Sequence, residues 1–346
     1  MHALKSDDIR FFSGSSHPKL ASDIATYLSA PLDNTIISRF SNDNLFIQLL
    51  ASVRGRVVYI IQSFVPPVSD HLLELLMMID SAYHAGAREV HAIIPYFSYA
   101  RSDKKDAPRI SITARLIADL LVTAGTTHIM TMTLHSPQVH GFFSVPTDPL
   151  TARHLFIRYY LSQGLDPKKT IVVSPDVSRA KSAARFAAFL GLPVATSQKE
   201  RLSDNEVLVT ETIERQVSGF QQALIYDDEI ATGTTVLELS KLLVSFGIQE
   251  IHIICTHGVF TGDSLRSLSE FPQISEILTT NTVPIPPEKR ISKLRVISVA
   301  PIFGEAIWRN YNRRSIGDLF SFSQEEKEFS NRGESMDPNH HHSFSI

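Results

Sequence analysis

Short runs of β-branched and other apolar residues alternate along the chain with longer segments in which apolar residues recur every three or four positions. Short runs of this kind predict buried strands, and the longer spacing predicts amphipathic helices. In the first half the expected strands are Val57–Gln62, Val90–Pro95 and Ile129–Leu134, and the expected helices run from about Asp70 to Ala85 and from about Ile112 to Thr123. Gly86 and Gly125 follow these helices and are expected to end them.

The second half of the chain repeats this alternation. Its expected elements are strands near Thr170–Ser174, Ala223–Asp227 and Glu250–Thr256, and helices near Arg179–Leu190 and Thr234–Phe246. Strands that alternate with helices predict parallel sheets flanked by helices, so we expect the α/β class and two domains of similar plan. The boundary is expected around Pro146–Thr151, because the prolines there should break any regular element before the helical run at Ala152–Leu161.

The composition narrows the class of function. The chain has 346 residues, enough for about two domains. Its 33 basic and 36 acidic residues leave a net charge of -3, which argues against a general binder of nucleic acid or of anionic membranes. No apolar run reaches the roughly 18 residues of a transmembrane span. Residues 1–10 lack the basic and apolar segments of a secretory signal, so we expect a cytoplasmic protein.

Two features predict no chemistry of their own. Cys255 is the single cysteine and follows the apolar run Ile251–Ile254, so a buried, inert thiol is expected rather than a nucleophile. Beyond about Phe320 the sequence becomes polar and includes three adjacent histidines, His340 to His342. Residues 323–346 are therefore expected to form a polar, disordered tail without a metal role.

The segment Ala223–Thr235 is the most informative in the chain. An apolar strand ends in Asp227 and Asp228, and a loop of small residues around Gly233 then opens a helix. Such a loop aims backbone N–H groups and hydroxyls at a phosphate, while paired carboxylates accept hydrogen bonds from sugar hydroxyls. An Asp-capped helix start is the alternative, but the strand and the paired acids favour a ribose 5-phosphate site. The pattern resembles the ribose-phosphate loop of type I phosphoribosyltransferases.

Five further stretches carry a sharper resemblance. They are Pro95-Tyr-Phe-Ser-Tyr-Ala-Arg-Ser-Asp-Lys104, Thr133-Leu-His-Ser-Pro-Gln-Val-His-Gly-Phe-Phe143, Arg39-Phe-Ser-Asn-Asp-Asn44, Val172-Val-Ser-Pro-Asp176 and Lys199-Glu-Arg201. With them, the chain from about Phe11 to Phe320 resembles the ribose-phosphate pyrophosphokinase (phosphoribosyl pyrophosphate synthetase) family. The resemblance implies Mg²⁺-dependent transfer of the pyrophosphoryl group of ATP to the 1-hydroxyl of ribose 5-phosphate, which gives 5-phosphoribosyl 1-pyrophosphate and AMP.

The resemblance also implies where each ligand binds. It predicts two domains of type I phosphoribosyltransferase-like fold, with ATP on residues 1–148 and ribose 5-phosphate on residues 149–322. The expected catalytic residues are Lys199, Arg201 and His135, and the expected metal ligands are His135 and Asp176. The expected ATP contacts are Phe40, Asn42, Asn44, Arg101, Ser102, Asp103 and His135. The expected ribose 5-phosphate contacts are Asp227, Asp228, Ala231, Thr232, Gly233, Thr234 and Thr235.

Several of these residues have simpler interpretations. Lys199 and Arg201, expected in a loop that closes over the phosphates, also fit a solvated charge cluster. A histidine at a strand end such as His135 is more often structural, and Phe40 fits a core aromatic as well as a cover for the adenine base. For Lys199, Arg201 and His135 it is the resemblance that favours the functional interpretation.

The chain departs from the family pattern at three places. Asn42, Asp43 and Asn44 replace the usual Asp-Gly-Glu, Ala231 and Thr234 replace a common Asp and Gly, and Ser178 and Arg179 replace the glycines after Asp176. These changes motivate one alternative, a non-catalytic regulatory subunit that resembles a synthetase. The phosphate motif by itself also permits a phosphoribosyltransferase. The resemblance further implies a homo-oligomer, either a hexamer or a dimer, with no nucleic-acid or membrane partner.

Overall fold

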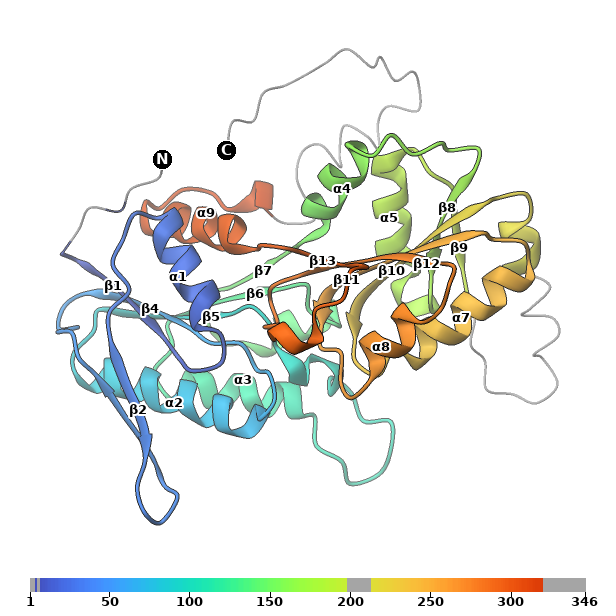
Figure 1. The fold of residues 1–346 in the computed structure, drawn as a ribbon. Coiled ribbons are helices and arrows are strands. Elements are labelled where there is room, and N and C mark those ends of the chain that lie inside the picture. Colours follow the sequence, from blue (N-terminus) through green and yellow to red (C-terminus); the bar gives the residue numbers. More distant parts are fainter. Residues whose placement is uncertain (1–3, 5–6, 198–212, 320–346) are drawn as a thin grey trace.

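Two parallel sheets, each enclosed between two layers of helices, form the protein (Figure 1). The computed structural model describes residues 4, 7–197 and 213–319. The first half of the chain builds one sheet and the second half builds the other, as the alternation of strands and helices predicts. Within these described residues, no helix combines the length and the hydropathy needed to cross a membrane.

The first sheet is fully parallel. Its strands lie in the order β1 (Ile9–Ser13), β4 (Val57–Ile61), β5 (Glu89–Ile94), β6 (His128–Met132) and β7 (Thr147–Leu150). Helix α1 (Pro18–Tyr27) packs on one face, and α2 (Val68–His84) and α3 (Thr113–Thr123) pack on the other. An antiparallel hairpin of β2 (Thr35–Arg39) and β3 (Leu45–Leu49) projects away from this sheet (Figure 1).

The second sheet has six parallel strands. Their order is β13 (Leu294–Ile297), β12 (Ile274–Thr280), β11 (Glu250–Gly258), β10 (Gln222–Ile230), β8 (Thr170–Ser174) and β9 (Val194–Thr196). Helices α4 (Arg153–Leu161) and α5 (Ala180–Leu190) cover one face, and α7 (Thr234–Ser245) and α8 (Ser264–Ser269) cover the other. Short 3-10 turns η1 (Ser98–Arg101), η2 (Pro137–Phe142), η3 (Val177–Arg179), η4 (Pro287–Lys289) and η5 (Gly317–Leu319) join these elements.

The last helix of each half packs against the other half. Helix α4 follows β7 of the first sheet, yet its Phe156 and Tyr160 pack against Tyr226 and Phe186 of the second half. Helix α9 (Ala300–Tyr311) follows β13 of the second sheet but lies on α1 above the first sheet (Figure 1). As a result, one continuous hydrophobic core covers this face of both sheets.

Most of the expected elements are confirmed with shifts of one to three residues at their ends. Gly86 and Gly125 follow α2 and α3 with positive φ, as expected of helix stops, and Cys255 is buried. The expectation of an irregular boundary at Pro146–Thr151 is wrong, because Thr147–Leu150 forms β7. Pro149 is tolerated there since β7 is an edge strand, where a missing N–H group interrupts no further pairing. The domain boundary after residue 148 stays a prediction.

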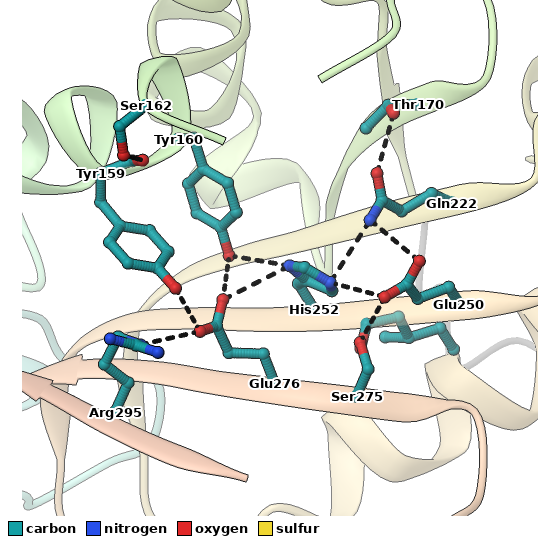
Figure 2. Close-up of polar contacts among 11 residues, drawn as sticks. Tyr159, Tyr160, Ser162, Thr170, Gln222, Glu250, His252, Ser275, Glu276 and Arg295 are labelled. Carbon is teal, nitrogen blue, oxygen red and sulfur yellow. Dashed lines mark hydrogen bonds and ion pairs between the residues drawn. The ribbon is translucent and has the colours of Figure 1, made fainter. Parts of the chain in front are cut away.

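A polar network crosses the second sheet beneath α4 (Figure 2). The ring of His252 lies 3.0 Å from Glu250 Oε1 through Nε2 and 3.3 Å from the Tyr160 hydroxyl through Nδ1. Thr170, Gln222, Ser275, Glu276 and Arg295 extend the network across five strands. The first sheet repeats the Glu-x-His pattern, because His91 Nε2 lies 3.0 Å from Glu89 at the start of β5. This repetition supports the common plan of the two halves.

Candidate active site between the two sheets

The carboxyl ends of β6 and β10 bring side chains from both halves of the chain together. Thr133 leaves β6 with φ +43°, an unfavourable conformation for a β-branched residue, and the chain then turns to His135. His135 Nδ1 lies 2.8 Å from Asp228 Oδ2, across a sequence separation of 93 residues. A further bond from Thr256 Oγ1 of β11 to Thr133 Oγ1, at 3.3 Å, joins the end of β6 to the neighbouring strand of the second sheet. The site therefore lies where ligands of open parallel sheets bind.

The two carboxyl groups of β10 have opposite tendencies to ionise. Burial raises the pKa of Asp227 well above its usual range, and the neighbouring Asp228 adds to the shift. Burial also acts to raise the pKa of Asp228, but the bonds from His135 and the charge of Arg179 outweigh it and hold this pKa well below its usual value. Asp228 is therefore the ionised member of the pair. The strand also runs on to Ile230, three residues beyond the expected end.

Arg179 completes the contact between the halves. It ends η3, is buried, and places Nη2 2.8 Å from His135 Nδ1 and Nε 3.3 Å from Asp228 Oδ1. The same Nη2 donates to the carbonyl oxygen of His135. The sequence marks Arg179 as a departure from glycine but assigns it no function, because a partner 44 residues away is not visible in a local motif.

A second cross-domain contact lies beside the first. Arg101 Nη2 is 3.5 Å from Glu229 Oε1, and the Tyr96 hydroxyl donates a hydrogen bond to the same carboxylate. Burial raises the pKa of Glu229, an effect that the charge of Arg101 opposes. The structure thus places the predicted ATP residue Arg101 next to the predicted ribose residues, and it adds Tyr96 and Glu229, which the sequence analysis missed.

The loop after β10 has the conformation of an anion site. Gly233 precedes α7 with φ +73°, which an L side chain rarely adopts, and a Cβ there would lie 3.3 Å from Leu268 Cδ1. Thr232, Thr234 and Thr235 are exposed, and Thr234 Oγ1 donates to Thr232 Oγ1 at 3.2 Å. The first N–H groups of α7 have no partner within the helix, so this end of the helix can receive a phosphate.

The predicted metal ligands are held by hydrogen bonds. Asp176 accepts from Ser178 Oγ at 2.6 Å and from the Arg179 backbone N–H at 3.1 Å, while His135 contacts Asp228 and Arg179. Within residues 7–197 and 213–319, no three His, Cys, Asp or Glu side chains gather as a metal cluster. This donor set suits Mg²⁺, which commonly uses one or two carboxylates together with water and substrate phosphates.

Three of the other predicted ATP residues lie in the turn of the β2–β3 hairpin, and two follow η1. Phe40 is 57% exposed near the tip of the β2–β3 hairpin and packs edge-on against Phe46, so its interpretation as a core residue is wrong. Asn42 and Asn44 bond to one another in the same turn. Ser102 Oγ lies 3.4 Å from Thr113 Oγ1, and Asp103 is partly exposed. The predicted catalytic residues Lys199 and Arg201 lie outside the described residues.

Two family models match the chain. The N-terminal domain of ribose phosphate pyrophosphokinase matches residues 9–125, and the phosphoribosyl synthetase-associated domain matches residues 212–321. Among curated proteins, one from Streptomyces coelicolor is 48% identical over 90% of this chain and 98% of its own length. The ribose-phosphate pyrophosphokinase of Caldanaerobacter subterraneus is 40% identical over 91% of this chain and 98% of its own.

A solved structure has the same architecture. The phosphoribosylpyrophosphate synthetase from Mycobacterium smegmatis superposes with a TM-score of 0.81 at 33% sequence identity. The match covers 89% of this chain and all of the other. The comparisons by sequence and by structure therefore point to the same family over nearly the whole described chain.

Proposed function

The chain belongs to the ribose-phosphate pyrophosphokinase family, and from this premise we propose how its two halves share the reaction. The enzyme transfers the pyrophosphoryl group of ATP to the 1-hydroxyl of ribose 5-phosphate, giving 5-phosphoribosyl 1-pyrophosphate and AMP. The observation that carries the assignment of residues is the contact of His135 with Asp228, since it joins the proposed ATP half to the proposed ribose half.

Ribose 5-phosphate binds to the second half in this proposal. The N–H groups at the start of α7 and the hydroxyls of Thr232, Thr234 and Thr235 hold the 5-phosphate, and Gly233 leaves room for its approach. Ala231 lines the same loop. Asp227 and Asp228 bond the ring hydroxyls, Asp228 as an acceptor because it stays ionised. The sugar is thereby held with its 1-hydroxyl toward the first half.

ATP binds to the first half, with its phosphates between Arg101 and His135. The reaction forms a bond from the 1-hydroxyl oxygen to the β-phosphorus, breaks the bond to the α,β-bridging oxygen, and releases the hydroxyl proton. Charge builds up on the phosphate oxygens, so cationic groups stabilise the transition state. Lys199 and Arg201 are proposed to add two such groups. His135, held at Nδ1 by Asp228, is proposed to present Nε2 to Mg²⁺ and the ATP phosphates.

Mg²⁺ is the proposed cofactor. Asp176 and His135 are the residues of this chain that would hold it, with ATP phosphates and water as its other ligands. Bound there, the ion would neutralise phosphate charge and polarise the β-phosphoryl group.

The hairpin of β2 and β3 supports a further proposal about assembly. Phe40, Asn42 and Asn44 lie in the turn of a hairpin that projects from the first sheet, and the aromatic side chain of Phe40 is 57% exposed there. We infer that they meet ATP where two copies of the chain adjoin, within a hexamer or a dimer. A cytoplasmic location remains part of the proposal.

A direct assay tests the function. Purified protein is supplied with ATP, Mg²⁺, inorganic phosphate and ribose 5-phosphate, and both AMP and 5-phosphoribosyl 1-pyrophosphate are measured. We expect the two products in equal amounts. Absence of both would favour a non-catalytic subunit, and release of pyrophosphate from 5-phosphoribosyl 1-pyrophosphate on addition of a base would favour a phosphoribosyltransferase.

A further inference from the structure

The chain bends at Thr133 in a conformation that this residue type avoids. Thr133 directly follows β6 and has φ +43°, in the left-handed region where a β-branched side chain is strained. Strain of this kind costs about 1 to 3 kcal/mol and persists only where the surrounding structure enforces it. His135 comes two residues after the bend, so the contacts that enforce the bend also determine where His135 lies.

Hydrogen bonds from two other segments of the chain fix every polar group of Thr133. Its N–H donates to the carbonyl oxygen of Leu150 at 2.8 Å, and its Oγ1 accepts from the Ala152 N–H at 3.4 Å. The other two bonds come from β11 of the second half: Thr256 Oγ1 donates to Thr133 Oγ1 at 3.3 Å, and His257 Nε2 donates to the Thr133 carbonyl oxygen at 3.2 Å. The second half therefore helps to enforce a bend in the first half.

The contact with His257 fits a bent chain and not an extended one. His257 Nε2 lies 3.1 Å from the carbonyl oxygen of Met132 and 3.2 Å from that of Thr133. Carbonyl oxygens only accept, so Nε2 is the donor to both. In an extended strand, successive carbonyl groups point to opposite sides, so one donor reaches both only where the chain bends. This shared bond therefore favours the strained conformation of Thr133 over the extended one.

The ring of His257 is itself held in place. It is buried, with 3% of its surface exposed, and its Nδ1 accepts from Thr282 Oγ1 at 2.9 Å. The Tyr96 ring packs against it at a centroid distance of 4.9 Å. The donor that reaches the bend is therefore fixed relative to β11 and to the paired strand β10, which carries Asp228.

We propose that His257 is a positioning residue for the reaction: through the two carbonyl oxygens at the Thr133 bend, it holds His135 beside Asp228. The 2.8 Å contact between His135 Nδ1 and Asp228 Oδ2 is the geometry that the bend maintains. The inference rests on the proposed function, because the place of His135 matters for catalysis only if ATP and Mg²⁺ bind next to it. It gives a buried histidine of the ribose half a task in the ATP half.

The first test uses kinetics. His257→Leu removes the donor and should lower kcat by about 10- to 100-fold, because a displacement of about 1 Å at the site can cost about 100-fold. KM for ribose 5-phosphate should change by less than about threefold, since the loop around Gly233 is not altered. His257→Gln supplies an amide donor in nearly the same place and should recover most of kcat. An unchanged kcat in His257→Leu, or equal losses in the two variants, would overturn the proposal.

The second test uses crystal structures of the protein without substrates. In His257→Leu we expect Thr133 to leave the left-handed region and the distance between His135 Nδ1 and Asp228 Oδ2 to exceed 3.5 Å. In His257→Gln both features should match the parent. A bend and a contact that persist in His257→Leu would contradict the proposal. If the parent formed no product but its variants changed as expected, the proposed function would fail and the task of His257 at the bend would stand.

Two further variants separate positioning from a general loss of stability. His91→Leu removes another buried histidine, with 2% of its surface exposed, which contacts Glu89 at the start of β5. It should lower the midpoint of thermal unfolding without lowering kcat, and a loss of kcat as large as in His257→Leu would overturn the proposal. If His257→Leu does not fold, His257→Phe replaces it with the same expectations, because it keeps a ring against Tyr96 and has no donor.

Discussion

His257 joins the two sheets as a neutral group. Its Nδ1 accepts from Thr282 Oγ1 at 2.9 Å, and its Nε2 lies 3.1 Å from the carbonyl oxygen of Met132 at the end of β6. Complete burial lowers the pKa of His257 to about 4. A residue that packs the two halves together is therefore held in its uncharged form at neutral pH.

His257 is expected to make the protein sensitive to acid. The unfolded chain takes up a proton near pH 6.5 but the folded protein does so only near pH 4, so stability is fully present above pH 6.5 and falls between these values. At pH 5 this residue lowers the free energy of unfolding by about 2 kcal/mol relative to neutral pH. Urea unfolding of the parent and of His257→Gln at pH 7 and pH 5 measures it. Equal losses in the two proteins would contradict the assignment.

At the scale of residues, the sequence predicts best where a motif is local. The loop around Gly233 and the acids of β10 were found because they are neighbours in the chain. Arg179 and Glu229 were not assigned, since their charges matter only beside His135 and Arg101, and those partners come from the other sheet. Local patterns carry no information about such pairings.

At the scale of elements, the loop before α7 depends on the conformation of one glycine. Gly233→Ala must keep φ near +73° and also brings a Cβ to 3.3 Å from Leu268 Cδ1. We expect KM for ribose 5-phosphate to rise by roughly tenfold, as a shift of the loop by a fraction of an ångström weakens phosphate binding. Initial-rate kinetics with varied ribose 5-phosphate give this value.

Gly191→Ala is the matched control for that variant. Gly191 ends α5 with φ +65°, and no atom lies within 4 Å of the Cβ position. Alanine at this position has a similar backbone cost of about 1 kcal/mol, and the position has no role in binding the phosphate. If both variants raised KM to the same extent, the effect would come from general strain and the phosphate loop would be misassigned.

The packing of α9 on α1 also depends on a glycine. A Cβ on Gly304 would lie 2.2 Å from Tyr27 Cδ1, so the two helices must separate if alanine is introduced. We expect Gly304→Ala to lower the free energy of unfolding by about 1 to 3 kcal/mol, the usual cost of overpacking. Thermal unfolding measures the change. Gly141→Ala, where nothing lies within 4 Å, should leave the midpoint nearly unchanged.

Elements buried on both faces were the easiest to predict. β4, β5, β6 and β8 read as short apolar runs and were found within a residue or two. β7 was missed because its prolines indicate a break, and only its place at the edge of the sheet makes Pro149 acceptable. The β2–β3 hairpin was missed since β2 is mostly polar and both strands are partly exposed, although β3 is rich in apolar residues.

At the scale of the whole molecule, the shared core predicts that the two halves unfold together. Trp308 is the single tryptophan, and it lies in α9, which covers the first sheet although it follows the second. Trp308 fluorescence and far-ultraviolet circular dichroism should therefore give the same midpoint in urea. An earlier fluorescence transition would show that α9 detaches on its own and would contradict a single cooperative unit.

The exchange of α4 and α9 has a consequence for synthesis. A nascent chain released from the ribosome up to Leu150 contains every strand of the first sheet, but the helix that completes its core, Ala300–Tyr311, has yet to be made. The apolar surface of α1 must stay uncovered until α9 has been made. The first half is therefore a poor candidate for expression as an isolated fragment. While the intervening 150 or so codons are translated, its exposed apolar surface must be protected by chaperones or must aggregate slowly enough for α9 to arrive.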